Sequence, residues 1–143
     1  AGCKDTDLVL IHDSVRPLLG QDIISSNIAI CKAYGYAITG IKCREAILES
    51  EDGFSTSVSI PRDKLIRTQT PQTFCLGNII NIHEEAKQKG IVDSVASCTL
   101  IAEVGGYEMH IVPGSEKNIK ITTVEDLEIL KALMHTSKDE WLK

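Results

Sequence analysis

Short apolar runs alternate with helix-like patterns along the first third of the chain. Residues 7–12 (DLVLIH) form an apolar run with β-branched content, consistent with a strand covered on both faces. Residues 21–35 repeat isoleucine at helical spacing and end at a glycine, and residues 36–42 return to strand composition. A strand, a helix and a strand in this order make a βαβ unit. The pattern therefore predicts an α/β fold with a mostly parallel sheet.

The next stretch predicts a projecting β-hairpin. Residues 45–50 and 54–60 are typical of two short strands around a turn that ends at Gly53. Few of these residues are apolar enough to cover a core. We therefore expect an inserted β-arm at residues 43–66 that extends away from the domain.

The second half of the chain predicts the remaining strands and helices. One strand is expected at residues 65–70, where Pro71 breaks it, and another at residues 107–113. Helices are expected at residues 75–89 and 93–103. No internal repeat, low-complexity segment or linker interrupts this order.

The last predicted helix begins near Thr123 and Asp126, whose spacing resembles a capping box. Its apolar positions follow a helical stripe, which we expect to face inward. These positions are Leu127, Leu130, Leu133 and Met134. Residues 1–143 are thus expected to form a single domain.

Composition and charge narrow the class of protein. Apolar residues make up 43% and charged residues 24%, which is typical of a folded domain. The net charge is −5 with no lysine or arginine run, which argues against a nucleic-acid surface. No apolar stretch approaches the ~20 residues of a membrane helix. The five cysteines are scattered and never spaced C-x-x-C, so we expect reduced thiols in a cytoplasmic protein.

Two charged residues follow the first predicted strand. Asp13 and Arg16 lie just past its end, where ligands of open parallel sheets bind. An aspartate there can hold Mg²⁺ or a sugar hydroxyl, and an arginine can bind phosphate through two hydrogen bonds. The alternative is a capped turn in which the two residues pair with each other. On this stretch alone both interpretations stay open.

Two further stretches carry candidate polar contacts. Thr70 and Gln72 flank Pro71, where hydroxyl and amide groups can line a pocket or form an ordinary turn. Lys117 and Lys120 precede the last helix, and a helix N-terminus with a lysine favours an anion. The alternative for both lysines is a solvated position.

Taken together, "HDSVRP", "TQTPQTF" and "NIKITTVEDL" closely resemble the cytidylyltransferases of sugar-alcohol phosphates. These are the 2-C-methyl-D-erythritol 4-phosphate and ribitol-5-phosphate cytidylyltransferases. The resemblance spans residues 7–134, with the motifs in the family's order and spacing. It implies a Rossmann-like nucleotidyltransferase fold that transfers CMP from CTP to a polyol phosphate and releases pyrophosphate. The requirement for a divalent cation, Mg²⁺, comes with it.

The resemblance also implies site residues and a partner. Asp13 and Lys120 are the expected catalytic residues, and Asp13 is also the expected metal ligand. The expected substrate-binding residues are Arg16, Arg62, Thr70, Gln72 and Thr122. The β-arm implies a homodimer in which Arg62 enters the neighbouring subunit's site.

Some positions depart from the family pattern. Ala46 and Val92 stand where the methylerythritol enzymes have threonine, which favours ribitol 5-phosphate slightly as the acceptor. The family's glycine-rich CTP loop does not occur here. We therefore expect the N-terminal part of the fold to be missing, and a chain that is inactive alone. The alternatives are a non-catalytic acceptor-binding or dimerisation fragment, and a nucleotidyltransferase of this fold that uses another nucleotide.

Overall fold

A four-stranded sheet organises the fold, which a computed structural model describes for residues 2–135. The strands are β1 Leu8–Ile11, β2 Tyr36–Lys42, β3 Ile47–Glu49, β4 Val58–Ile60, β5 Ile66–Cys75 and β6 His110–Pro113. The helices are α1 Gln21–Tyr34, α2 Leu76–Gln88, α3 Ser97–Val104 and α4 Val124–His135, with a 3-10 turn at Arg62–Lys64. Within the described range, every helix is too short or too polar to cross a bilayer.

The sheet is mixed, with the strand order β1-β5-β2-β6. Strand β5 is antiparallel to both β1 and β2, whereas β2 and β6 are parallel. The α/β class and the βαβ unit are confirmed, because β1 and β2 run in the same direction around α1. The prediction of a mostly parallel sheet is wrong for the strand pairing. Strand β5 returns from the hairpin without a crossover helix, so it enters between β1 and β2 in the opposite direction.

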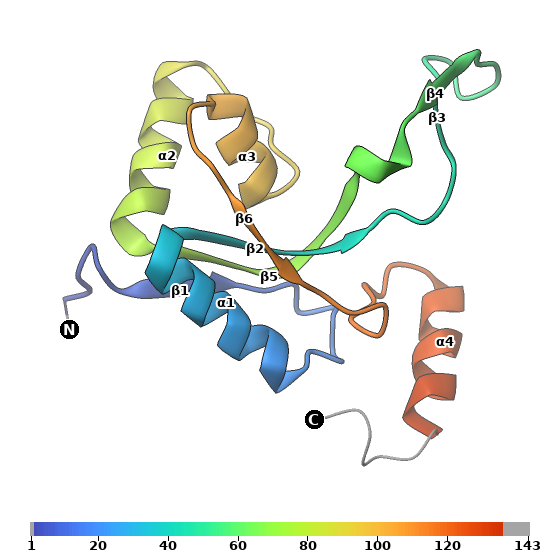
Figure 1. The fold of residues 1–143 in the computed structure, drawn as a ribbon, viewed down its shortest axis with the longest axis horizontal. Helices are drawn as coiled ribbons and strands as arrows, with labels where there is room; N and C mark the ends of the chain where they lie inside the picture. The colour runs from blue at the N-terminus through green and yellow to red at the C-terminus, as the bar shows by residue number, and fades with distance from the viewer. Residues whose placement is uncertain (1, 136–143) are drawn as a thin grey trace.

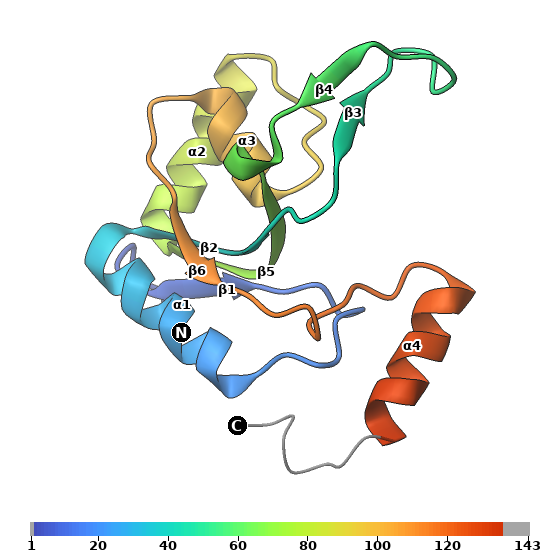
Figure 2. The same cartoon turned by 45° about the vertical axis from the view of Figure 1, so that its right-hand side comes forward.

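Helices cover the sheet on both faces, with α1 on one and the α2–α3 pair on the other (Figures 1 and 2). Successive residues of β2 serve the two layers, because side chains alternate along a strand. Ala37 packs with Cys31 of α1, and Ile38 packs with Phe74 beneath α2 and α3. Buried apolar residues of these two helices complete that layer: Ile79, Ile82, Ala86, Leu100, Ile101 and Val104.

Two strand predictions need correction. Strand β1 pairs only with β5 among the described strands, and its Ile11 is 40% exposed, so β1 is not covered on both faces. Strand β5 continues through Pro71 instead of breaking there. The β2–β5 register shifts opposite this proline, and the Thr39 hydroxyl donates a hydrogen bond to the Pro71 carbonyl oxygen at 2.7 Å. This irregularity accommodates a residue that has no N–H to donate.

Helix α3 and strand β6 begin later than predicted, at Ser97 and His110. The Ala96 N–H donates to the Thr99 hydroxyl at 2.9 Å, which sets the start of the helix there. The residues before it form an irregular segment whose valines lie in solvent. Gly105 and Gly106 have φ values of 79° and 83°, a backbone conformation that keeps this connection out of the strand.

The hairpin prediction is confirmed, because β3 and β4 pair antiparallel and project from the domain (Figure 1). The Asp52 carboxylate orders the tip by accepting the N–H groups of Phe54 and Ser55, each at 2.9 Å. These backbone hydrogen bonds hold the pKa of Asp52 well below its usual range. The Phe54 side chain is 96% exposed at this tip. The arm therefore presents an ordered aromatic side chain to solvent.

Helix α4 begins as predicted but does not turn its apolar stripe inward. The Thr123 N–H donates to Asp126 at 2.8 Å and the Asp126 N–H donates to the Thr123 hydroxyl, which is the expected capping box. Leu127 and Met134 are 41% and 61% exposed, and Leu130 and Leu133 are half-buried. The preceding loop carries α4 away from the sheet, so the helix stands apart (Figures 1 and 2).

Candidate active site

The sheet direction brings together two loops that are far apart in the sequence. Strands β1 and β6 run in the same direction, so the residues that follow them meet at one edge of the sheet. Asp13 and Arg16 follow β1, and Lys120 lies in the loop after β6. Asp13 Oδ2 lies 3.0 Å from Arg16 Nε and 3.4 Å from Lys120 Nζ. Three of the predicted site residues therefore form one cluster, which we call the Asp13 cluster.

The two cations of the Asp13 cluster differ in how tightly they are held. The Arg16 side chain is 10% exposed, and its Nη1 donates to the Asn118 carbonyl oxygen at 2.7 Å. The Lys120 side chain is 47% exposed. Arg16 is thus a fixed donor, whereas the Lys120 ammonium can reach an anion in solvent.

The Asp13 carboxyl is ionised at neutral pH. Partial burial alone would raise its pKa, but the hydrogen bond from Arg16 and the positive charge of Lys120 outweigh burial and lower it. A carboxyl group with a lowered pKa serves as a hydrogen-bond acceptor or metal ligand and does not donate a proton. Asp13 can therefore orient cations and hydroxyl groups.

Removing Lys120 is expected to raise the pKa of Asp13 toward its usual range. In the wild-type chain the folded state keeps this carboxylate ionised at lower pH than the unfolded state does. This contribution of Asp13 to the free energy of unfolding is fully present at pH values above its pKa in the unfolded state. It is lost as the pH falls through its pKa in the folded state. Carboxyl carbon NMR titration of Lys120→Ala tests the shift, with Lys32→Ala on the far helix α1 as the matched control. An unchanged Asp13 pKa in Lys120→Ala would contradict the ion pair.

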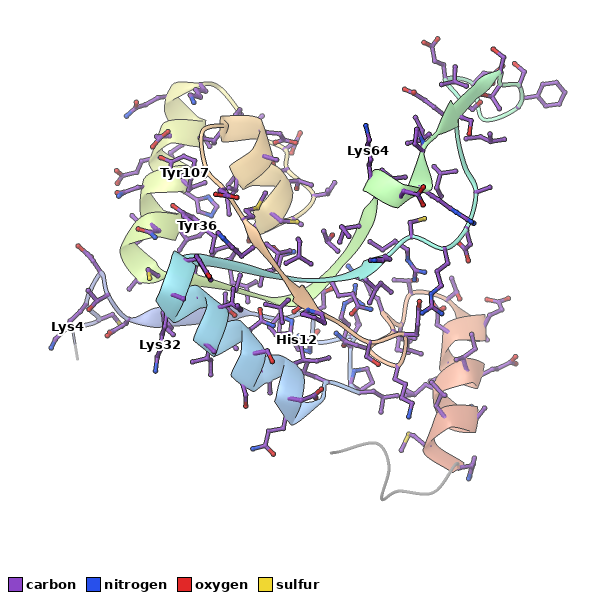
Figure 3. The ribbon with its side chains drawn as sticks, in the orientation of Figure 1. Lys4, His12, Lys32, Tyr36, Lys64 and Tyr107 are labelled. Atoms are coloured by element: carbon purple, nitrogen blue, oxygen red, sulfur yellow. The ribbon has the colours of Figure 1, made fainter. Side chains whose placement is uncertain are left out.

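Thr70 joins the Asp13 cluster from β5. Its hydroxyl oxygen accepts the Asp13 N–H at 3.0 Å and lies 2.9 Å from His12 Nδ1. His12 Nε2 lies 3.1 Å from the Arg16 carbonyl oxygen, which can only accept, so Nε2 carries the proton. His12, labelled in Figure 3, thus bridges the Arg16 backbone and the Thr70 hydroxyl and orients Thr70 toward Asp13.

The donors at this site fit Mg²⁺ only in part. Nowhere in residues 2–135 do three histidine, cysteine, aspartate or glutamate side chains gather to hold a metal. Asp13 Oδ2 already faces two cations, and Oδ1 has no partner among the described residues. Mg²⁺ commonly takes one or two carboxylates and completes its shell with water and substrate phosphates. Asp13 fits the role of such a single protein ligand.

A cavity of about 320 Å³ adjoins the Asp13 cluster. Its wall carries the cations Arg16, Lys120 and Arg67 and the carboxylates Glu116 and Asp126, with Arg67 3.7 Å from Glu116. This volume is at the lower end for a small-molecule pocket. The arrangement can bind a small phosphorylated ligand and place its phosphate near Lys120.

Two predicted substrate-binding residues lie outside the Asp13 cluster. Gln72 is buried, and its amide bonds Cys98 at the start of α3, with Nε2 3.2 Å from Sγ and Oε1 accepting the backbone N–H at 3.0 Å. The Thr122 hydroxyl donates to Asp126 at 2.9 Å within the cap of α4. Both side chains make structural hydrogen bonds in this chain.

Arg62 lies at the base of the arm. Its Nη1 donates to the Arg44 carbonyl oxygen at 2.7 Å, and both residues line a cavity of about 550 Å³ together with Lys42. Within one chain, the cavity lined by Arg62 includes none of Asp13, Arg16 and Lys120, and the Arg62 hydrogen bond goes to the arm instead.

Sequence reasoning missed three residues that shape the site: His12, Gln69 and Asn118. All lie inside the quoted motifs, but their contacts join positions 46 to 58 residues apart in the sequence. Hydrogen bonds between groups that are far apart in the sequence leave no periodic pattern in that sequence. Nothing in the sequence distinguishes Gln69 and Asn118 from ordinary polar loop residues, because only the structure shows that they are buried.

Comparisons with known proteins identify a matching family model and similar relatives. The family model described as IspD: 2-C-methyl-D-erythritol 4-phosphate cytidylyltransferase matches residues 2–136. Ribitol-5-phosphate cytidylyltransferase of Streptococcus agalactiae serotype Ia is 37% identical over 136 residues, which cover 95% of this chain and 56% of that protein. The 2-C-methyl-D-erythritol 4-phosphate cytidylyltransferase of Clostridium novyi is 38% identical over 136 residues, or 94% of this chain and 58% of that protein.

A solved structure gives the same result. The crystal structure of the Francisella tularensis 2-C-methyl-D-erythritol 4-phosphate cytidylyltransferase is similar with a TM-score of 0.79 and 28% identity. The match covers 90% of this chain and 60% of that one. The chain thus spans somewhat more than half the length of the relatives it matches.

Proposed function

Because this chain belongs to the IspD (2-C-methyl-D-erythritol 4-phosphate cytidylyltransferase) family, we propose that its protein transfers CMP from CTP to a polyol phosphate. The observation that carries the proposal is the Asp13 cluster, in which one carboxylate holds two cations beside a pocket of suitable size. An oxygen of the acceptor phosphate attacks the α-phosphorus of CTP. The bond from this phosphorus to the bridging oxygen breaks, and pyrophosphate leaves with the electron pair.

The residues of the Asp13 cluster supply position and charge, because this reaction needs no protein nucleophile. The Lys120 ammonium neutralises charge on the phosphates, and Arg16 offers a fixed second cation. Asp13 holds both cations in place and accepts a hydroxyl of the acceptor. Asp13 would hold Mg²⁺, which would supply further charge neutralisation for the substrate phosphates.

Ribitol 5-phosphate is the acceptor we propose over methylerythritol 4-phosphate. Val92 is 87% exposed, so an apolar side chain faces solvent where the methylerythritol enzymes carry a threonine. Ala46 likewise lacks a hydroxyl at the base of the arm. Overall identity does not separate the two acceptors, because relatives of both names match at 37% and 38%.

Pyrophosphate release tests the reaction. For the whole protein that contains this chain, we expect release that requires CTP, Mg²⁺ and ribitol 5-phosphate, with a lower rate on methylerythritol 4-phosphate and none with chelator. If pyrophosphate release requires a nucleoside triphosphate other than CTP, that nucleotide replaces CTP in the proposal. Calorimetric binding of ribitol 5-phosphate without any release would instead support a non-catalytic acceptor-binding module.

We also propose a cytoplasmic homodimer that forms through the β-arm. The five cysteines all carry free thiols, which supports a reducing compartment. An isolated two-stranded hairpin is marginal in water, so the projecting arm favours packing on a second copy. The ordered tip with its exposed Phe54 supplies the kind of aromatic anchor that interfaces use.

Replacing Phe54 with serine is expected to weaken self-association about tenfold, because a buried aromatic anchor contributes more than 1 kcal/mol to an interface. Sedimentation velocity across a concentration series measures the change. Val95→Ser is the matched control, since Val95 is 93% exposed but lies off the arm. Equal self-association of Phe54→Ser and the wild type would remove the arm tip from the interface.

A further inference from the structure

We propose that Gln69 and Asn118 are positioning residues: a buried pair of amides that fixes Arg16 and the loop carrying Lys120. We call this pair the amide clamp. Its link to catalysis rests on the proposed function, but its effect on Arg16 does not. The clamp joins β5 to the loop at residues 114–120, which carries Lys120 into the Asp13 cluster.

Gln69 binds the loop with both ends of its amide. Its side chain projects from β5, and the residue is 5% exposed. Nε2 donates to the Ser115 carbonyl oxygen at 2.9 Å and to the Asn118 carbonyl oxygen at 3.3 Å. Oε1 accepts the Ser115 N–H at 3.3 Å. One side chain thus satisfies backbone groups of a loop 46 residues away in the sequence.

Asn118 closes the clamp from the loop side. It is fully buried, and its Nδ2 donates to the Thr70 carbonyl oxygen at 2.8 Å and to Gln69 Oε1 at 3.4 Å. Its backbone carbonyl oxygen accepts Arg16 Nη1 at 2.7 Å. Asn118 therefore ties three parts of the site together: β5, the Arg16 guanidinium, and the loop that reaches Lys120 two residues later.

The loop passes very close to the clamp at Gly114. A Cβ atom at this position would lie 2.3 Å from Gln69 Oε1 and 3.0 Å from a methyl carbon of Thr39. Such a side chain would displace the Gln69 amide without removing any of its hydrogen-bonding groups. Gly114 thus permits the approach on which the clamp depends.

Burial makes the clamp selective for one loop arrangement. A buried amide or carbonyl group that loses its hydrogen-bond partner is strongly destabilising, so alternative loop positions that break these bonds are disfavoured. Asn118 Oδ1 has no donor among the described residues, so the Asn118 side chain acts through its Nδ2 alone. Without Nδ2, the loop loses its direct bond to Thr70, and the Arg16 acceptor keeps only the longer bond from Gln69 Nε2 at 3.3 Å.

Asn118→Ala tests the clamp, and Gly114→Ala is a second variant that displaces Gln69 while both amides remain. The matched control is Asn27→Ala, since Asn27 is also fully buried and its Nδ2 donates to the Ile23 carbonyl oxygen and the Thr39 hydroxyl. One readout is the NMR signal and hydrogen exchange of the Arg16 Nε–H. The other is the calorimetric affinity for ribitol 5-phosphate.

We expect both site variants to speed exchange of the Arg16 Nε–H and to weaken ribitol 5-phosphate binding, each about tenfold or more. Asn27→Ala is expected to lower the melting temperature and leave both readouts unchanged. Unchanged Arg16 exchange in Asn118→Ala and Gly114→Ala overturns the proposal, as does an equal change in Asn27→Ala. If Asn118→Ala does not fold, Gly114→Ala decides alone.

The two readouts also separate this inference from the proposed function. If the wild-type protein binds neither ribitol 5-phosphate nor methylerythritol 4-phosphate, the proposed acceptors are wrong. Faster Arg16 exchange in the variants would still support the clamp in that case, and unchanged exchange would still overturn it.

Discussion

Asparagine at position 13 is expected to slow CMP transfer by about 10²–10³-fold and to leave the fold intact. The side chains are nearly equal in size, so packing at this partly exposed position changes little. The substitution removes the one negative charge that faces Arg16 and Lys120 at 3.0 and 3.4 Å. Both cations remain, so the pocket becomes more positive and the phosphate of the acceptor is still attracted.

This reasoning predicts which kinetic constant changes. The kcat falls because the metal and the acceptor hydroxyl lose their carboxylate, whereas the KM for the polyol phosphate stays equal or decreases. Steady-state pyrophosphate release measures both constants, and circular dichroism with thermal unfolding checks the fold. Asp22→Asn on the exposed first turn of α1 is the charge-matched control. A higher KM at unchanged kcat would make Asp13 a ground-state binding residue only.

Local patterns predicted the elements well but not their assembly. The capping box at Thr123 and the hairpin around Gly53 depend on neighbouring residues, and both form as expected. The pairing of β5 depends on where the chain returns after the arm, which no periodicity encodes. The apolar stripe of α4 correctly predicted a helix but not that its apolar face would be buried. Burial also requires another element that covers this face.

The site residues were likewise predicted only in part. The family resemblance predicted that Asp13, Arg16 and Lys120 act together, and the structure brings them together because the loops after β1 and β6 meet at one end of the sheet. The roles of Gln69 and Asn118 were not predicted, because buried amides resemble ordinary polar loop residues in a sequence. Gln72 shows the converse. Its motif made it a candidate site residue, but its side chain makes structural hydrogen bonds to Cys98.

Mixing Arg62→Ala with Lys120→Ala is expected to restore activity that neither variant has alone. Within one chain Arg62 bonds Arg44 at the base of the arm, and its cavity is lined by none of Asp13, Arg16 and Lys120. In a site shared between two subunits, the arm of one subunit would place Arg62 beside the Asp13 cluster of its partner. A mixed dimer then holds one site with both residues and one site with neither. Random exchange of equal amounts makes half of the dimers mixed, so about a quarter of the wild-type rate should return.

A second mixture supplies the control, with Asp13→Asn in place of Arg62→Ala. Asp13 and Lys120 contact each other within one chain, so every site in that mixed dimer lacks one of the two residues and no activity should return. Native mass spectrometry of isotope-labelled subunits confirms exchange in both mixtures. Recovery in the Arg62 mixture alone requires that Arg62 and Lys120 act from different subunits. Absence of recovery after confirmed exchange would confine Arg62 to its own chain, and recovery in both mixtures would separate Asp13 from Lys120.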